Sequence, residues 1–209
     1  MRTLLLTPVL LASFAVGALA HTIEPAGAPP ADLPPAASGA LQKDGVRVLD
    51  GKKVVSEIWF VTKAPSGPKS SEEAVTLPMI PQGSFLGVIR LPERGADRRG
   101  QTIKPGVYTL RYGNYPQNGD HQGVEPQRDF LVLSPVAEDK DVTKALSFNA
   151  LMELSRKASN TPHPAVMSFW KVEGDFKPGI AEGGESEWVL QTKVGDLPVA
   201  VIVAGKNAH

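Results

Sequence analysis

Hydrophobic residues along this chain occur mostly in short runs of strand length, separated by segments rich in proline, glycine and charged residues. The clearest signal is VRVLDGKKVV at residues 46–55, where two β-branched runs flank Asp50-Gly51. Because Asp-Gly supplies the positive φ values of a tight turn, this segment predicts a β-hairpin. The second strand continues through IWFV at residues 58–61, and its consecutive apolar residues indicate burial on both faces.

Other runs with the length and composition of strands are residues 84–91, 107–112, 130–134, 165–172, 186–194 and 197–205. Gly195-Asp196 predicts a second tight hairpin between the last two of these runs. Residues 147–159 differ, because their apolar positions recur at helical spacing and Ser147 can cap the first turn. The chain is therefore expected to be mainly β, with one short helix.

About eight short strands, many Pro/Gly turns and a single helix are typical of an antiparallel β-sandwich, which is the fold we predict. A partly open barrel is the alternative arrangement. The content of hydrophobic residues, 42%, is sufficient for a real core.

The first twenty residues, MRTLLLTPVLLASFAVGALA, have the composition of a secretory signal peptide. Arg2 precedes an apolar stretch that ends in Ala18-Leu19-Ala20, and signal peptidase accepts small residues at these positions. We predict cleavage after Ala20, which makes His21 the mature N-terminus and places the protein in the periplasm or outside the cell. An uncleaved membrane anchor is the alternative, although Pro8 interrupts the apolar run.

Residues 21–43 are rich in proline and alanine and contain few bulky apolar groups. Such a segment buries too little surface to offset its ordering entropy, so we predict a mostly extended, solvated linker or tail. The folded domain is expected to comprise residues 44–209. No membrane span is expected after signal cleavage.

Charge and cysteine content exclude several classes of partner and site. Acidic and basic residues are equal in number, which removes any electrostatic argument for nucleic acid or acidic lipid. The chain has no cysteine, so it contains neither disulfides nor a thiol nucleophile. No Gly-x-Ser-x-Gly nucleophile elbow or phosphate-binding glycine loop occurs either.

The segment IKPGVYTLRY at residues 103–112 resembles the Pro-Gly-x-Tyr-x-Leu strand entry of many secreted bacterial β-sandwich domains. The whole chain resembles uncharacterised exported bacterial proteins of that architecture. The resemblance implies the fold and the compartment but no activity, because one fold supports many functions.

The most polar and least regular segment is NYPQNGDHQGVEPQRDF at residues 114–130, between two predicted strands. This connection is longer than a usual hairpin loop, and long ordered loops are often functional. The candidate ligand-binding residues are Arg111, Asp120, His121, Arg128 and Asp129. The two arginines are able to clamp an anionic ligand. A purely structural loop, held by aspartate side chains that accept backbone N–H groups, explains most of the same residues.

A metal site is a further alternative in the same region. His121, Glu125 and His163 offer imidazole and carboxylate groups that suit Zn²⁺ or Cu²⁺, although their spacing matches no specific metal motif. His163 lies between two prolines, which fix the direction of its imidazole, and the two histidines meet only if both loops reach the same end of the fold.

His21 raises a separate possibility. An N-terminal histidine offers its α-amino group and ring nitrogen together, as in the copper brace of secreted copper monooxygenases. A Pro/Ala-rich tail and the lack of an evident second histidine argue against such a site. The sequence therefore favours an exported, non-catalytic binding or interaction module for an unknown protein or small ligand, without a cofactor. A metal-dependent periplasmic protein or enzyme is the alternative.

Overall fold

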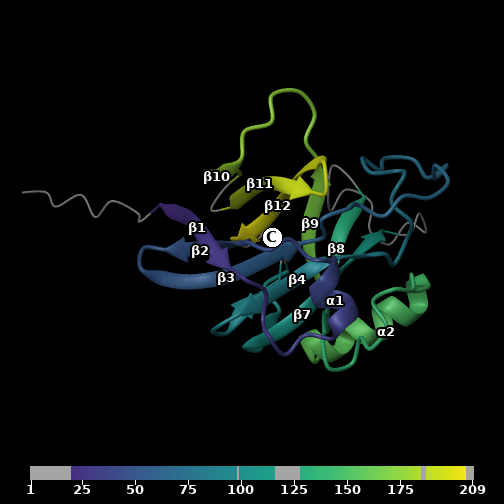
Figure 1. Cartoon of the computed structure of the whole chain (residues 1–209), viewed down its shortest axis with the longest axis horizontal. Coiled ribbons are helices and arrows are strands. Elements are labelled where there is room, and N and C mark those ends of the chain that lie inside the picture. The colour runs from purple at the N-terminus through teal and green to yellow at the C-terminus, as the bar shows by residue number, and fades with distance from the viewer. Residues whose placement is uncertain (1–19, 98, 116–127, 185–186, 206–209) are drawn as a thin grey trace, which may run out of the picture.

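The computed structural model describes residues 20–97, 99–115, 128–184 and 187–205, and its architecture is mainly β (Figure 1). The strands are β1 (His21–Gly27), β2 (Gly45–Asp50), β3 (Lys53–Phe60), β4 (Phe85–Leu91), β5 (Gly95–Ala96), β6 (Thr102–Ile103), β7 (Gly106–Asn114), β8 (Asp129–Pro135), β9 (Ala165–Lys171), β10 (Gly179–Glu182), β11 (Trp188–Val194) and β12 (Leu197–Ala204). The helices are α1 (Pro35–Ala40) and α2 (Phe148–Ser159). Among these residues, neither helix has the length and apolar character needed to cross a membrane.

Ten of the strands form one antiparallel sheet in the order β1-β2-β3-β4-β7-β8-β9-β12-β11-β10, while β5 and β6 pair separately. Strand β9 connects the two halves of the sheet, because residues 165–168 pair with β8 and residues 169–171 pair with β12. The two halves curve toward each other, so that the two edge strands of the sheet, β1 and β10, contact each other. The result is a nearly closed, barrel-like sheet.

The prediction of an antiparallel, mainly β fold is confirmed, and each predicted strand corresponds to a strand of the large sheet. The prediction of a sandwich is not supported, because a sandwich needs two separate sheets and these strands form one continuous sheet. The arrangement is closer to the barrel alternative. The structure also adds the helix α1 and the strands β1 and β10, none of which has a strong hydrophobic pattern.

Both predicted hairpins are confirmed. Gly51, between β2 and β3, has a φ of 60°, and Gly195, between β11 and β12, has a φ of 57°. An L-residue is strained in this conformation. At Gly195 space is limiting as well, because an added Cβ would lie 2.6 Å from the backbone nitrogen of Ala64.

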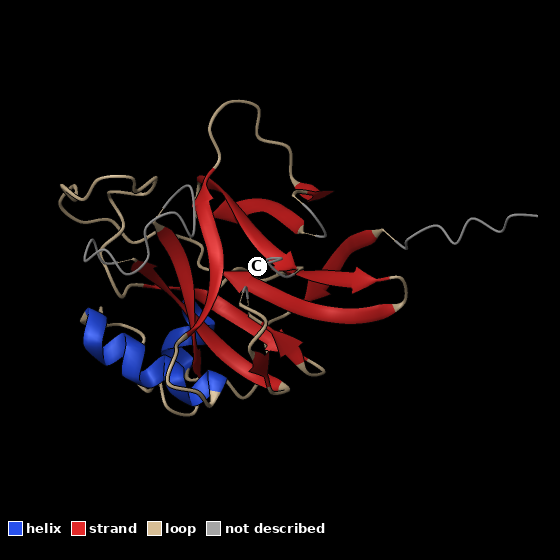
Figure 2. Ribbon diagram, turned by 180° about the vertical axis from the view of Figure 1, so that it is seen from behind, coloured by secondary structure: helices blue, strands red, loops and turns tan. Residues whose placement is uncertain are grey.

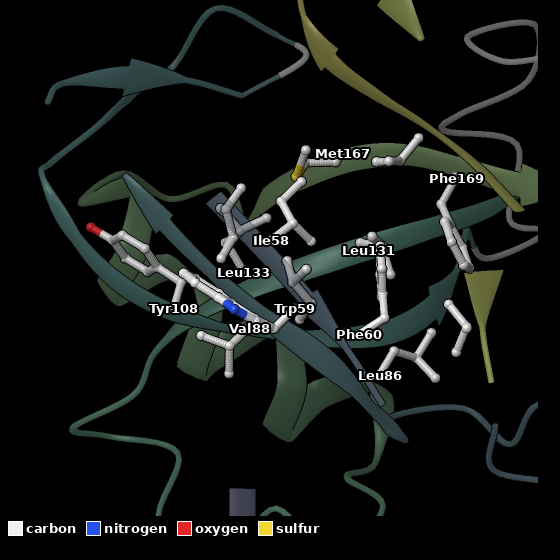
Figure 3. Close-up of a cluster of buried hydrophobic side chains, with 14 of the residues drawn as sticks. Ile58, Trp59, Phe60, Leu86, Val88, Tyr108, Leu131, Leu133, Met167 and Phe169 are labelled. Carbon is white, nitrogen blue, oxygen red and sulfur yellow. The ribbon is translucent and has the colours of Figure 1, made fainter. Parts of the chain in front are cut away.

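The main core fills the inside of the barrel-like sheet. Alternation along the strands places Ile58, Ile89 and Tyr108 opposite one another on β3, β4 and β7. The next such row includes Leu110 and Leu133 on β7 and β8. Figure 3 shows part of the main hydrophobic cluster, with inward-facing side chains such as Ile58 and Phe169 together with Trp59 and Val88 on the opposite face of β3 and β4. Because these rows run across neighbouring strands, the register of the sheet and the packing of the core determine each other.

Residues 21–43 are not the solvated tail that their composition predicts. Residues 21–27 form β1, which pairs with β2 along its length. Leu33 and Ala37 in the following segment are buried, and the indole nitrogen of Trp59 donates a 2.7 Å hydrogen bond to the carbonyl of Gly27. The segment therefore covers the outer face of β3, where Trp59 is 1% exposed. Residues 1–19 lie outside the described residues, so the signal peptide stays a prediction.

Helix α2 begins and ends as its sequence predicts. The hydroxyl of Ser147 accepts a hydrogen bond from the backbone of Ala150, and Asn160 ends the helix in the left-handed conformation. The apolar side of α2 packs on the outer face of β8 and β9 against Phe130, Val132 and Val166, which forms a second, smaller hydrophobic cluster. Figures 1 and 2 show both helices outside the sheet, on the same side of the molecule.

A basic cleft beside helix α2

Arg111 was a predicted ligand residue, but the structure uses its whole guanidinium group internally. The side chain is fully buried and forms a two-point salt bridge with Asp139, with nitrogen–oxygen distances of 2.7 and 2.8 Å. The remaining donors bond to the carbonyl oxygens of Gly83, Lys144 and Asp141. Because a guanidinium group has five N–H donors and all are used, Arg111 has none left for a ligand.

Asp129 is also structural. Its carboxylate accepts hydrogen bonds from the backbone nitrogens of Thr76 and Leu77 and from the hydroxyl of Tyr112. Burial, with a smaller effect from the Asp129 charge, raises the pKa of the Tyr112 phenol well above its usual value. The phenol therefore stays protonated, and its hydroxyl donates a hydrogen bond to Asp129. The contacts of Asp129 fix the loop before β4 against the start of β8.

Arg128 lies near the end of the predicted loop, just before β8, and most of its donors are engaged. It donates to the carbonyl of Tyr115 and to that of Glu73, and it forms a 2.8 Å salt bridge with Glu72. It borders a cavity of about 410 Å³ that Glu72 also borders, so an acidic group already compensates its charge there. The predicted anion clamp of Arg111 with Arg128 is therefore not formed.

Asp120, His121 and Glu125 lie outside the described residues, so the predictions that fall on them stay predictions. His163 is described and exposed, and its hydrogen bonds with other described residues involve its backbone atoms alone. Within the described ranges, no group of three or more histidine, aspartate or glutamate side chains is arranged to hold a metal ion.

The structure places His163 at a cleft of about 240 Å³ between α2, β8 and β9, which we call the α2 cleft. Most of its lining residues are apolar or aromatic, among them Phe130, Phe148 and Met152, and three are basic: Arg99, Arg156 and His163. The ring of Tyr115 stacks on Phe130 with centroids 4.4 Å apart, which extends the aromatic surface. Apolar walls with a few converging polar groups are typical of small-molecule sites.

The spacing of the sequence positions these groups. Phe148, Met152 and Arg156 are four residues apart on α2, so their side chains project from one side of the helix. Phe130 and Val166 come from the outer face of the sheet below them. The helix thus supplies one wall, the sheet supplies the floor, and a basic group stands at the C-terminal end of the wall.

The turn after α2 forms the opposite side. Two prolines flank His163, and the hydroxyl of Ser159 donates a 2.5 Å hydrogen bond to the His163 carbonyl. Arg156 donates from Nε to the carbonyl of Pro162 at 2.8 Å, and Arg99 donates from Nη2 to the carbonyl of Pro164. These contacts hold two guanidinium groups beside one turn.

The electrostatics of the α2 cleft favour an anion. None of its described lining residues is acidic, although Arg99 forms a long ion pair with Asp97, which does not line the cleft, at 3.8 Å from Nε. Nη1 and Nη2 of Arg156 have no hydrogen-bond acceptor in the described part of the chain. Those N–H groups are therefore available to a bound carboxylate or similar group.

Sequence reasoning selected His163 but missed the other residues of this cleft. The four-residue spacing of Phe148, Met152 and Arg156 is a visible signal, although an amphipathic helix explains it equally well. Arg99 is 64 positions from His163 in a charged loop, and its sequence context contains nothing that connects the two. Only the packing of α2 on β8 and β9 brings them together.

No protein-family model, no curated protein and no solved structure matches this chain. The case for a site therefore depends on its geometry.

Proposed function

We propose that this protein is an exported, non-catalytic binding module whose α2 cleft holds a small organic anion with an apolar or aromatic body. The observation that carries the proposal is the convergence of Arg99, Arg156 and His163 on a cleft with aromatic walls and no acidic residue among its described lining residues. Export is supported by residues 1–20, whose pattern is that of a signal peptide.

The two kinds of lining residue perform different tasks. Burying an apolar body against Phe148, Met152 and Phe130 provides binding free energy in proportion to the area removed from water. The guanidinium groups contribute charge-assisted hydrogen bonds to an acidic head group, which set the orientation of the ligand. The volume, about 240 Å³, lies below the usual range of about 300–1,000 Å³ for drug-sized ligands, so a smaller molecule fits better.

The proposal is tested with pairs of probes that differ only in charge. Benzoate and cinnamate are titrated into the protein beside benzamide and cinnamamide, and backbone and methyl NMR shifts are recorded. We expect the acids to shift resonances of Phe148, Met152 and Val166 with a dissociation constant of about 1 mM or lower, and the amides to bind at least about tenfold more weakly.

A matched pair of variants locates the binding. Arg156→Gln removes the charge that lines the cleft and should weaken benzoate binding, whereas Lys157→Gln removes a neighbouring charge that pairs with Glu138 and should not. Equal binding of acid and amide, or equal behaviour of the two variants, would contradict an anion site at this cleft.

A further inference from the structure

His21 is the residue that the predicted cleavage would make the N-terminus, and it is ordered in the structure. It is the first residue of β1 and pairs with Asp50 of β2. The entropic argument against a site at a flexible tail therefore does not apply, because the pairing of β1 with β2 has already ordered this residue.

The environment of the His21 ring is unusual. The ring packs on the indole of Trp188 with centroids 4.8 Å apart, which connects β1 to β11 where the sheet nearly closes. Nδ1 of His21 is buried and has no hydrogen-bond partner in the described structure. Buried polar atoms nearly always have a partner, so an unpaired nitrogen here calls for an explanation, and a bound ion is one.

Cleavage after Ala20 would place a second nitrogen able to bind a metal ion, the α-amino nitrogen, beside Nδ1 of His21. The backbone nitrogen of His21 is an amide in the unprocessed chain and becomes an α-amino group in the processed one. An α-amino nitrogen and Nδ1 of the same histidine close a six-membered ring around a metal ion. Two nitrogen donors suit Cu²⁺, which binds more tightly than other divalent first-row metals to a given set of ligands.

Asp50 offers an oxygen ligand nearby. Directly opposed residues of an antiparallel pair project their side chains from the same face, with Cβ atoms about 4.5–5.5 Å apart. His21 and Asp50 are such a pair, and Asp50 is exposed. The arrangement has one histidine rather than two, so it differs from a two-histidine copper brace.

We infer that the processed protein binds one Cu²⁺ ion at its N-terminus, through the α-amino nitrogen and Nδ1 of His21 with the Asp50 carboxylate beside them. The inference depends on the processing that forms part of the proposed export, and it is independent of the organic anion in the α2 cleft. It concerns binding alone and includes no redox step. Because the amino group must lose its proton, affinity should fall as the pH is lowered.

Trp188 supplies a direct readout. Cu²⁺ quenches indole fluorescence at short range, and the Trp188 ring already contacts His21. Protein secreted from its own leader is checked by mass spectrometry for a first residue of His21 and is then titrated with Cu²⁺. We expect a stoichiometry of one and strong quenching. Trp188→Phe should remove most of the quenching and keep the binding, as measured by calorimetry.

Three further chains make the test specific. His21→Ala should lose the site, and a histidine-free N-terminal extension, which keeps the nitrogen of His21 in a peptide bond, should weaken binding at least about a hundredfold. His163→Ala should bind as the parent does. A different first residue would refute the processing, whereas correct processing with no Cu²⁺ binding, or with equal binding by the extended chain, would overturn the copper site alone.

Discussion

Arg111 and Asp139 form an ion pair that is almost completely removed from water, with the two side chains 0% and 3% exposed. Moving two charges into the interior costs free energy that their attraction often fails to recover, so such a pair is weak support for stability. The clearer effect of the pair is to fix the position of the segment before α2. Arg111 also holds the carbonyls of Lys144 and Asp141, and thereby attaches the segment before α2 to β7.

Removing one partner of this pair should be strongly destabilising. In Asp139→Ala the buried guanidinium loses its counter-charge, and we expect the free energy of unfolding to fall by about 3–5 kcal/mol in urea denaturation. The control is Glu138→Ala, which breaks the exposed pair with Lys157 and should cost no more than about 1 kcal/mol. Similar losses in the two variants would show that burial of the Arg111–Asp139 pair has been overestimated.

Arg111 also shows why candidate sites are difficult to recognise from sequence. An arginine in a strand beside a polar loop is equally suited to bind an anion or to pair with a carboxylate. Asp139 is 28 positions away, and no local pattern shows that it meets Arg111. Gly51 is the contrast, because the conformation that it requires depends on its immediate neighbours and was predicted correctly.

Among the elements, the two helices differ in how much of their structure the sequence reveals. The length, cap and apolar side of α2 all follow from local spacing. Helix α1 has six residues, PAASGA, and this composition of small residues with one proline is that of a linker. It is ordered because Ala37 is buried in the main hydrophobic cluster and the carbonyl of Ala40 accepts a hydrogen bond from the backbone nitrogen of Thr62, and only the tertiary structure provides these contacts.

A pair of substitutions in α1 tests whether this segment is part of the core. Ala37 is completely buried, so Ala37→Leu should overpack the interface and destabilise the protein by about 1–3 kcal/mol. The adjacent Ala36 is exposed, and Ala36→Leu should change stability by less than about 0.5 kcal/mol. Leucine and alanine have similar helix propensities, so a difference in thermal melting reports packing. No difference would indicate a loosely attached segment.

For the whole molecule, the positions of most strands were predictable but their closure into one sheet was not. Hydrophobic runs identify most strands of the sheet, and neighbours in sequence mostly pair in space. Whether such strands form two sheets or one depends on β9, which pairs first with β8 and then with β12. The edge strands β1 and β10 each pair on only one side and contribute little to the core. They therefore need no strong hydrophobic pattern, and β10 is also short. The α2 cleft forms outside this closed sheet, from residues that only the complete fold assembles.

The last prediction concerns the extent of the folded unit, and it compares chains that begin at His21 and at Asp44. The shorter chain loses β1 and the cover over Trp59, including buried Leu33 and Leu41. Burial of one leucine stabilises by roughly 1.5–3 kcal/mol, so the two leucines alone represent a large part of a typical stability of about 5–15 kcal/mol. We expect the shorter chain to have a sharply lower melting temperature, red-shifted Trp59 fluorescence and dye binding to exposed apolar surface.

A third chain, in which a Gly/Ser segment of equal length replaces residues 21–43, should behave like the truncated one. Equal stability of all three chains would restore the interpretation of this segment as a tail.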